Sequence, residues 1–376
     1  MVGGPRSDGA AVIFSRAWSL PPPELSGEPR KPARKKINLA LQGGGAHGAF
    51  TWGVIDQILE DGRLEVEGIS GASAGAMNAV MLADGLARGG ADEARKRLAD
   101  FWRSASLGGN LPAGQRALLA RLFSFMPIDG SPVQAWWEVM SNYFSPYDTN
   151  PLNINPLKDV VERFVDFDAV RKFENIQLFI SATNVHTGRL HVFDREKITA
   201  DAVMASACLP MLFQAVEIDG VPYWDGGYLG NPVIFPFFST TETEDVIVVQ
   251  INPMTRNETP RSSQEIVNRL NEITFNSSLL SEYRAIEFVG RLIDQGKLSR
   301  GKGPGQYRRI NMHRIFLDRE GRTYNAGSKI SNDYDFFQLL RDHGRRAARR
   351  FLDEHFEQIG VTSTVDLRSE VPAVKG

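Results

Sequence analysis

The chain has 376 residues and a formal net charge of −2, with 42% of its residues hydrophobic and 23% charged. This composition is typical of globular proteins and excludes a wholly disordered or fibrous chain, and the near-neutral charge argues against a strongly basic nucleic-acid binder. The single cysteine, Cys208, excludes an intrachain disulfide and any site with several cysteine ligands.

Residues 1–36 are expected to form a basic leader without regular structure. Five of the seven residues from Arg30 to Lys36 are basic, and the apolar run from Ala10 to Phe14 is too short for a secretory signal. A solvated tail is the simplest interpretation, and an electrostatic anchor for anionic lipid surfaces is the alternative. Without a signal and with a single cysteine, the protein is expected in the cytoplasm, with peripheral contact to a membrane.

Two strand–turn–helix units follow the leader. Strands are predicted at 37–41 and 66–70, and helices at 49–60 and 74–86. A strand that returns through a helix to the next strand predicts a parallel sheet covered by helices. The expected fold class is therefore α/β.

The remaining chain extends this plan into one α/β domain with a helical C-terminal part. An aromatic-rich segment, 121–156, is either a helical insertion that packs into the core or an acyl pocket or lid. Beyond this segment we predict strands at 176–183, 191–193, 215–218, 221–224, 245–251 and 309–317. We also predict one or two long helices at 263–294 and a final helix at 334–358. Residues 362–376 are expected to form a loose tail.

The segment Gly71-Ala72-Ser73-Ala74-Gly75 matches the pattern G-x-S-x-G. Its position between a predicted strand and a predicted helix is that of a nucleophile elbow, a sharp turn that lifts a serine hydroxyl out of the sheet. Only small residues surround Ser73, as such a turn requires, and the helix N-terminus brings N–H donors and a positive dipole end beside it. Ser73 is therefore a candidate nucleophile.

The glycine-rich turn from Gly43 to Gly48 follows the first strand and has two interpretations. It contains G-x-G-x-x-G, and Glu65 and Glu67 follow at about the distance that a dinucleotide-binding unit requires. Alternatively, the N–H groups of consecutive glycines converge on a developing alkoxide and form an oxyanion hole. The nucleophile elbow that follows favours the oxyanion hole.

A serine nucleophile needs a base, and none of the six histidines stands in a context that marks it as one. His47, inside the glycine turn, is a candidate for orienting that turn or contacting substrate. Asp225, followed by Gly226 and Gly227, ends a predicted strand whose other end already has a hairpin turn at 219–220. Partial burial among aromatic neighbours would raise the pKa of this carboxyl group and make Asp225 a candidate base.

Three motifs in this order resemble the patatin-like phospholipase family: G-G-G-x-x-G after the first strand, G-A-S-A-G on an elbow and D-G-G after a later hairpin. The segments 181–188 and 205–210 are also similar to that family. The resemblance covers about residues 37–240 and implies a three-layer α/β/α fold with a mainly parallel central sheet. This range is the expected catalytic domain, and 241–361 is an α/β extension packed on the same domain.

The resemblance implies a lipid acyl hydrolase of the phospholipase A, lysophospholipase or esterase type. Its Ser–Asp dyad works without histidine, so Ser73 is the nucleophile, Asp225 is the base, and an acyl-enzyme forms. Many members of the family carry Arg or Lys where this chain has His47. The implied oxyanion donors are Gly43, Gly44, Gly45 and Ala74. The glycines that support the motifs are Gly48, Gly71, Gly75, Gly226 and Gly227.

No metal or cofactor is expected, and the expected partners are a lipid or other acyl ester and a membrane surface, not nucleic acid. Three alternatives remain open: an acyltransferase with the same dyad, a non-catalytic lipid-binding protein and a nucleotide-binding oxidoreductase. The acyl-enzyme is common to the hydrolase and the acyltransferase, so the motifs fit both.

Overall fold

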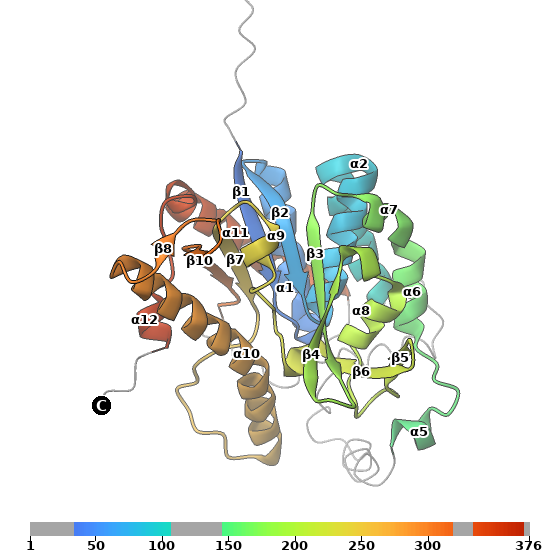
Figure 1. Ribbon diagram of the computed structural model, residues 1–376. Coiled ribbons are helices and arrows are strands. Elements are labelled where there is room, and N and C mark those ends of the chain that lie inside the picture. The colour runs from blue at the N-terminus through green and yellow to red at the C-terminus, as the bar shows by residue number, and fades with distance from the viewer. Residues whose placement is uncertain (1–33, 107–144, 319–333, 372–376) are drawn as a thin grey trace, which may run out of the picture. The chain divides into compact units, whose positions relative to one another are not determined.

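The computed structural model describes residues 34–106, 145–318 and 334–371, which all belong to one compact unit (Figure 1). The predicted leader, apart from its last three residues, lies outside the described residues. The same holds for most of the aromatic-rich segment, residues 121–144.

A mainly parallel sheet forms the centre of the fold. Its strand order is β10-β7-β1-β2-β3-β6-β5, and β4 also pairs with β3. The pairings β1–β2, β1–β7, β7–β10 and β2–β3 are parallel, whereas β3–β4, β3–β6 and β5–β6 are antiparallel. The strands are β1 (Lys35–Leu41), β2 (Leu64–Gly71), β3 (Gln177–Asn184), β4 (Arg189–Asp194), β5 (Val216–Ile218), β6 (Val221–Asp225), β7 (Asp245–Gln250) and β10 (Asn311–Phe316).

Helices cover both faces of this sheet, as predicted. The longer helices are α1 (Gly48–Asp61), α2 (Ala74–Ala105), α6 (Pro156–Phe164), α10 (Ser263–Asp294) and α11 (Tyr334–His355). The shorter ones are α5 (Pro146–Thr149), α7 (Phe167–Lys172), α8 (Ala200–Ser206), α9 (Phe237–Thr240) and α12 (Leu367–Glu370), and two short strands, β8 (Ser299–Arg300) and β9 (Gln306–Tyr307), pair separately. Within the described ranges, no helix has the length and apolar character that a membrane span needs.

The two faces of the sheet bury two separate apolar cores. Successive side chains of a strand point to opposite faces. Leu39 and Leu41 of β1 join a core with residues of α1, α2, α6, α8 and α11, whereas Ala40 joins a second core with residues of α9 and α10. The structure confirms the predicted α/β class with a mainly parallel central sheet between helical layers.

The observed elements differ from the predicted ones at both ends of the chain. β1 begins at Lys35, whose Nζ donates to the carbonyl oxygens of Phe356 at 2.8 Å and Ile359 at 3.0 Å, so the predicted leader is too long by two residues. The expected loose tail is ordered to residue 371. Its Thr364 and Val365 N–H groups donate to the Met312 carbonyl oxygen at 3.0 and 3.1 Å, which attaches this segment to β10.

The helix predicted at 74–86 is followed by a second helical part that was not predicted. α2 extends to Ala105 but consists of two helices joined at a kink, where Gly90 has a non-helical backbone (φ 75°, ψ −155°). Leu98, Phe101 and Trp102 of the second part are buried in the core, so tertiary packing stabilises this part.

Candidate active site

Ser73 stands on a sharp turn between β2 and α2. Its backbone has φ 53° and ψ −121°, a conformation that residues with a side chain rarely adopt. The turn is crowded, because a Cβ atom added at Gly75 would lie 2.2 Å from the Leu41 carbonyl oxygen and one at Gly71 would lie 2.6 Å from Gly75. The Ser73 N–H donates to Ser206 Oγ at 2.9 Å. The local geometry is therefore that of a nucleophile elbow.

The pairing of β3 brings Asp225 to this turn. β4 pairs along one edge of β3, and both β2 and β6 pair along the other edge. On that second edge, Gly71 at the end of β2 lies opposite Ile180, and Asp225 at the end of β6 lies opposite Ala182. Asp225 therefore lies near the end of β2, and Ser73 stands two residues after that strand ends.

The Asp225 carboxylate is fully buried and only half satisfied. Its Oδ1 accepts from the Gly227 N–H at 2.6 Å, whereas its Oδ2 has no hydrogen-bond partner among the described residues. The Asp225 backbone is held by hydrogen bonds to the Cys208 carbonyl at 2.7 Å and from Thr183 Oγ1 at 2.8 Å. The carboxylate is therefore rigidly placed with one oxygen available.

Burial raises the pKa of Asp225 to about 7, against the lowering effects of the Gly227 N–H and the Ser73 hydroxyl. The pairing of β2 and β6 along one edge of β3, together with this effect of Ser73, places the hydroxyl near the carboxyl group. A buried carboxylate that titrates near neutral pH beside a serine hydroxyl has the properties of a general base.

The glycine turn lies against the elbow, but one predicted oxyanion donor is already engaged. A Cβ atom added at Gly43 would lie 2.6 Å from the Ala72 carbonyl oxygen and 2.9 Å from Ser73 Cβ. The Gly43 N–H donates to Asn231 Oδ1 at 2.6 Å, so in this structure it does not point at an oxyanion. Within the described residues, the N–H groups of the other three predicted donors have no acceptor; these are Gly44, Gly45 and Ala74.

Side-chain amides that the sequence analysis did not identify hold the glycine turn. Asn231 Nδ2 and Asn252 Nδ2 donate to the Gly43 carbonyl oxygen at 3.4 and 2.8 Å. Gln42 Oε1 accepts the N–H groups of Ile251 and Asn252 at 2.9 and 2.8 Å. Gln42 and Asn252 follow β1 and β7, which are adjacent parallel strands. Polar residues at the ends of two predicted strands were the sequence pattern that could have identified this pair.

The remaining predicted residues have clear positions. A Cβ atom added at Gly48 would lie 2.7 Å from Ala74 Cβ, and one at Gly226 would lie 2.1 Å from the Ser181 carbonyl oxygen, so both sites require close backbone approach. His47 lies in a short 3-10 helix, Gly45–His47, and only 1% of its surface is exposed. This burial does not favour direct contact with substrate, and a role for His47 stays a prediction.

The dinucleotide interpretation of the glycine turn does not agree with the register of the sheet. Leu64, at the start of β2, lies opposite Lys35, at the start of β1. Glu65 and Glu67 therefore lie at the far end of the sheet from the glycine turn, which follows the end of β1. Glu67 instead accepts the N–H groups that open the segment before β7, at 2.9 and 2.8 Å.

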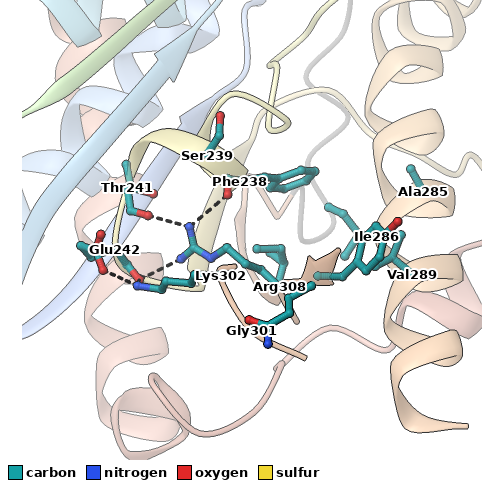
Figure 2. A pocket seen from close by; sticks show the side chains of 13 residues that line it. Phe238, Ser239, Thr241, Glu242, Ala285, Ile286, Val289, Gly301, Lys302 and Arg308 are labelled. Atoms are coloured by element: carbon teal, nitrogen blue, oxygen red, sulfur yellow. Dashed lines mark hydrogen bonds and ion pairs between the residues drawn. The ribbon is translucent and has the colours of Figure 1, made fainter. Parts of the chain in front are cut away.

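Two surface cavities border α10. One, of about 490 Å³, lies between α9, α10 and the β8–β9 pair, and its wall includes Phe238, Ile286 and Arg308 (Figure 2). No residue of the Ser73 elbow, the glycine turn or the Asp225 motif lines it. The other, of about 440 Å³, is lined by Tyr228 and Leu229, which directly follow that motif, and by α10.

Within the described ranges, no group of three or more His, Cys, Asp or Glu side chains is arranged to hold a metal ion.

Comparison with known proteins matches this architecture to one family. The family model described as patatin-like phospholipase matches residues 39–238, which include the glycine turn, Ser73 and Asp225. Comparison with curated proteins gave no match.

The chain also matches solved structures, among them the following three. VipD from Legionella pneumophila is 16% identical with a TM-score of 0.35, and the match covers 83% of this chain and 67% of that chain. The type III effector protein ExoU is 16% identical with a TM-score of 0.31, and the match covers 86% and 53% of the two chains. The structure of SpcU in complex with ExoU from Pseudomonas aeruginosa is 13% identical with a TM-score of 0.29, and the match covers 84% of this chain and 53% of that chain. The chain spans about half the length of ExoU.

The family match extends over more than half of the chain and contains all three sequence motifs. The protein therefore belongs to the patatin-like phospholipase family.

Proposed function

We propose that the protein is a lipid acyl hydrolase of the phospholipase A, lysophospholipase or esterase type in which Ser73 and Asp225 form a catalytic dyad. The observation that carries this proposal is the fully buried Asp225 carboxylate, whose Oδ1 accepts from the Gly227 N–H, next to a serine on a strained elbow. Membership in the family supports lipid hydrolysis as the general activity.

The first half-reaction forms an acyl-enzyme. Asp225 accepts the Ser73 hydroxyl proton while Oγ attacks the ester carbonyl carbon, which gives a tetrahedral oxyanion. The N–H groups of Gly44, Gly45 and Ala74 are the donors for this oxyanion, and the dipole of α2 adds to their effect. When the intermediate collapses, the ester C–O bond breaks, and Asp225 returns its proton to the leaving alcohol.

The second half-reaction releases the acyl group. Asp225, deprotonated again, takes a proton from water, and the hydroxide oxygen bonds to the acyl carbon. Collapse of this second intermediate breaks the bond to Ser73 Oγ, which takes the proton back, and the fatty acid leaves. One carboxyl group therefore serves as base and acid in turn, with no net change in the enzyme.

Labelling with a fluorophosphonate probe, mapped by mass spectrometry, tests the dyad. The wild-type protein should be modified at Ser73, the Ser73→Ala variant should not, and Asp225→Asn should react far more slowly because its serine is no longer activated. Ester turnover should fall by at least about 10³-fold in both variants. The matched control is Ser277→Ala, which removes an exposed serine of α10 and should label like wild type.

The outcomes also distinguish the alternatives. Labelling and esterase activity that persist in Ser73→Ala would overturn the assignment of the nucleophile. An absence of labelling in wild type, both in buffer and in detergent, would favour a non-catalytic lipid-binding protein. Faster acyl transfer to an added lipid alcohol than to water would favour an acyltransferase.

A further inference from the structure

Four apolar side chains are exposed along one side of the first half of α10. Ile266, Val267, Leu270 and Ile273 each keep between 43% and 57% of their surface exposed. Their spacing of mostly three and four residues places them on neighbouring turns of one side of the helix, which we name the α10 apolar face. Single exposed apolar residues are common on proteins, but a continuous stripe marks a surface that is covered in function.

The opposite side of the same turns is polar and buried. The Glu272 side chain is 1% exposed and forms ion pairs with Arg256 at 2.8 Å and Arg269 at 3.3 Å. Asn276 Oδ1 accepts from Gln42 Nε2 at 2.8 Å. This part of α10 therefore buries polar groups and exposes apolar ones, which is the reverse of an ordinary surface helix.

The first half of α10, which carries the α10 apolar face, contacts the candidate active site through its opposite, buried side. Phe275, two residues after Ile273, packs its ring edge-on against Tyr228, with 5.7 Å between the ring centroids. Asn231, which holds Gly43, also donates from Nδ2 to the Phe275 carbonyl oxygen at 3.2 Å. In Figure 1 the first half of α10 projects below the lower end of the sheet, the end of the view at which β5 and β6 are also drawn.

Two further exposed apolar side chains belong to segments that contact Asp225. Met211 follows closely after Cys208, whose carbonyl oxygen accepts from the Asp225 N–H at 2.7 Å. The Leu229 N–H donates to the Gly226 carbonyl oxygen at 3.1 Å, directly after the catalytic carboxylate. Exposed apolar groups therefore occur on both segments next to Asp225 as well as on α10.

We propose that the α10 apolar face docks on the surface of a neutral phospholipid bilayer and brings the Ser73 site to its substrate. This inference rests on the proposed lipid hydrolysis, because an enzyme whose ester substrate lies in a bilayer must approach it with the side that holds the active site. Arg269 and Glu272 are the charged residues of the segment 266–277, and they pair with each other. Insertion of apolar side chains, and not attraction to anionic headgroups, therefore drives the binding.

Flotation with vesicles of pure phosphatidylcholine tests the surface. The full chain carrying Ser73→Ala is used, so that binding is measured without hydrolysis. In this background, Leu270→Ser combined with Ile273→Ser should weaken partitioning by roughly a hundredfold, about tenfold for each side chain. Phe288→Ser is the matched control, since Phe288 is 52% exposed on the second half of the same helix and should not change binding. Raising the salt concentration should leave binding unchanged.

A fluorescence measurement reports on the same face and leaves Leu270 unchanged. Cys208 is buried, so a cysteine introduced by Ile273→Cys can be labelled selectively with an environment-sensitive fluorophore. Vesicles should shift its emission to the blue, whereas the same label at Phe288→Cys should not respond.

The results separate this inference from the proposed function. Equal vesicle binding by the Leu270→Ser, Ile273→Ser variant and its parent would overturn the docking face. A wild-type dimer that this double substitution converts to a monomer would also overturn it, because a second copy would then cover the face. Wild-type hydrolysis of a soluble ester is measured in parallel. Hydrolysis without vesicle binding would reject the docking face alone, and vesicle binding without hydrolysis would reject the hydrolase alone.

Discussion

Burial of Asp225 gives its carboxyl group the proton affinity that a base for a serine hydroxyl needs. At its ordinary pKa of 3.8 an aspartate is charged at neutral pH but is a weak base. Burial raises the pKa of Asp225 to about 7, so near neutral pH the carboxylate form is still substantially populated and is far more basic. The Gly227 N–H fixes Oδ1, which leaves Oδ2 for proton transfer.

The pH dependence of the reaction follows from this pKa. In the proposed mechanism, acylation needs the charged form of Asp225, which is lost as the pH falls through about 7. We expect kcat/KM for a soluble neutral ester to decrease by about tenfold for each pH unit below that value and to level off above it. The control variant is His191→Gln, whose ring packs on Tyr223 of β6 at 5.2 Å between centroids, and it should keep the same profile. A profile that falls only near pH 4 would contradict the role of a raised carboxyl pKa.

The packing of α1 against α11 supports the position of the glycine turn. The two helices approach so closely that a Cβ atom added at Gly53 would lie 1.9 Å from the Arg341 carbonyl oxygen, and one at Gly344 would lie 2.1 Å from that of Phe50. α1 begins at Gly48, the last residue of the glycine turn, so the contact with α11 helps to fix the position of that turn.

Gly53→Ala tests this close contact. Alanine has the higher helix propensity, yet its methyl group cannot be placed without moving the two helices apart. We expect the free energy of unfolding, measured by urea titration, to decrease by roughly 1–3 kcal/mol. Ser277→Ala on the exposed side of α10 should stay within about 0.5 kcal/mol of wild type. An increase in stability for Gly53→Ala would mean that the helices are less tightly packed than described.

At the scale of the whole molecule, the C-terminal residues complete the second core. Val365 and Val371 are buried with residues of β7, β10 and α10, and Glu370 pairs with Arg314 of β10 at 2.8 Å. The same core supports α10, and on the same side of this helix Asn276 accepts from Gln42, which directly precedes the glycine turn. The end of the described chain therefore supports the active-site side of the fold.

Replacing Val365 and Val371 together by serine should destabilise the protein. Each substitution removes buried apolar surface and places a hydroxyl group in the core, so the free energy of unfolding should fall by roughly 2–4 kcal/mol. Val361→Ser is the matched control, because Val361 is 75% exposed, and its effect on thermal or urea unfolding should be small. Equal stability of the double variant and the control would show that residues 362–371 do not contribute to the core.

Much of the local structure was predictable from sequence patterns. The strand–turn–helix around Ser73 was predicted because the small residues at 71–75 leave few other ways to join a strand to a helix. The helical segment 263–294 was predicted with its observed bounds, as one or two helices, and it forms one helix. Two features depended on distant partners, which local patterns do not reveal. The Gly43 N–H is taken by Asn231, and residues 362–371 pack on β10 although they lack a strong pattern of their own.

The sequence by itself therefore determined the α/β class and the identity of the motifs, because short-range spacing controls turns, strands and helices. Only the tertiary structure decided how these parts meet. Ser73 and Asp225 become neighbours because β2 and β6 share one edge of β3, and such pairing depends on contacts between segments far apart in the chain. The exposed side of α10 was likewise undetermined, because the polar groups around Gln42 and Arg256, and not the helix alone, decide which side is buried.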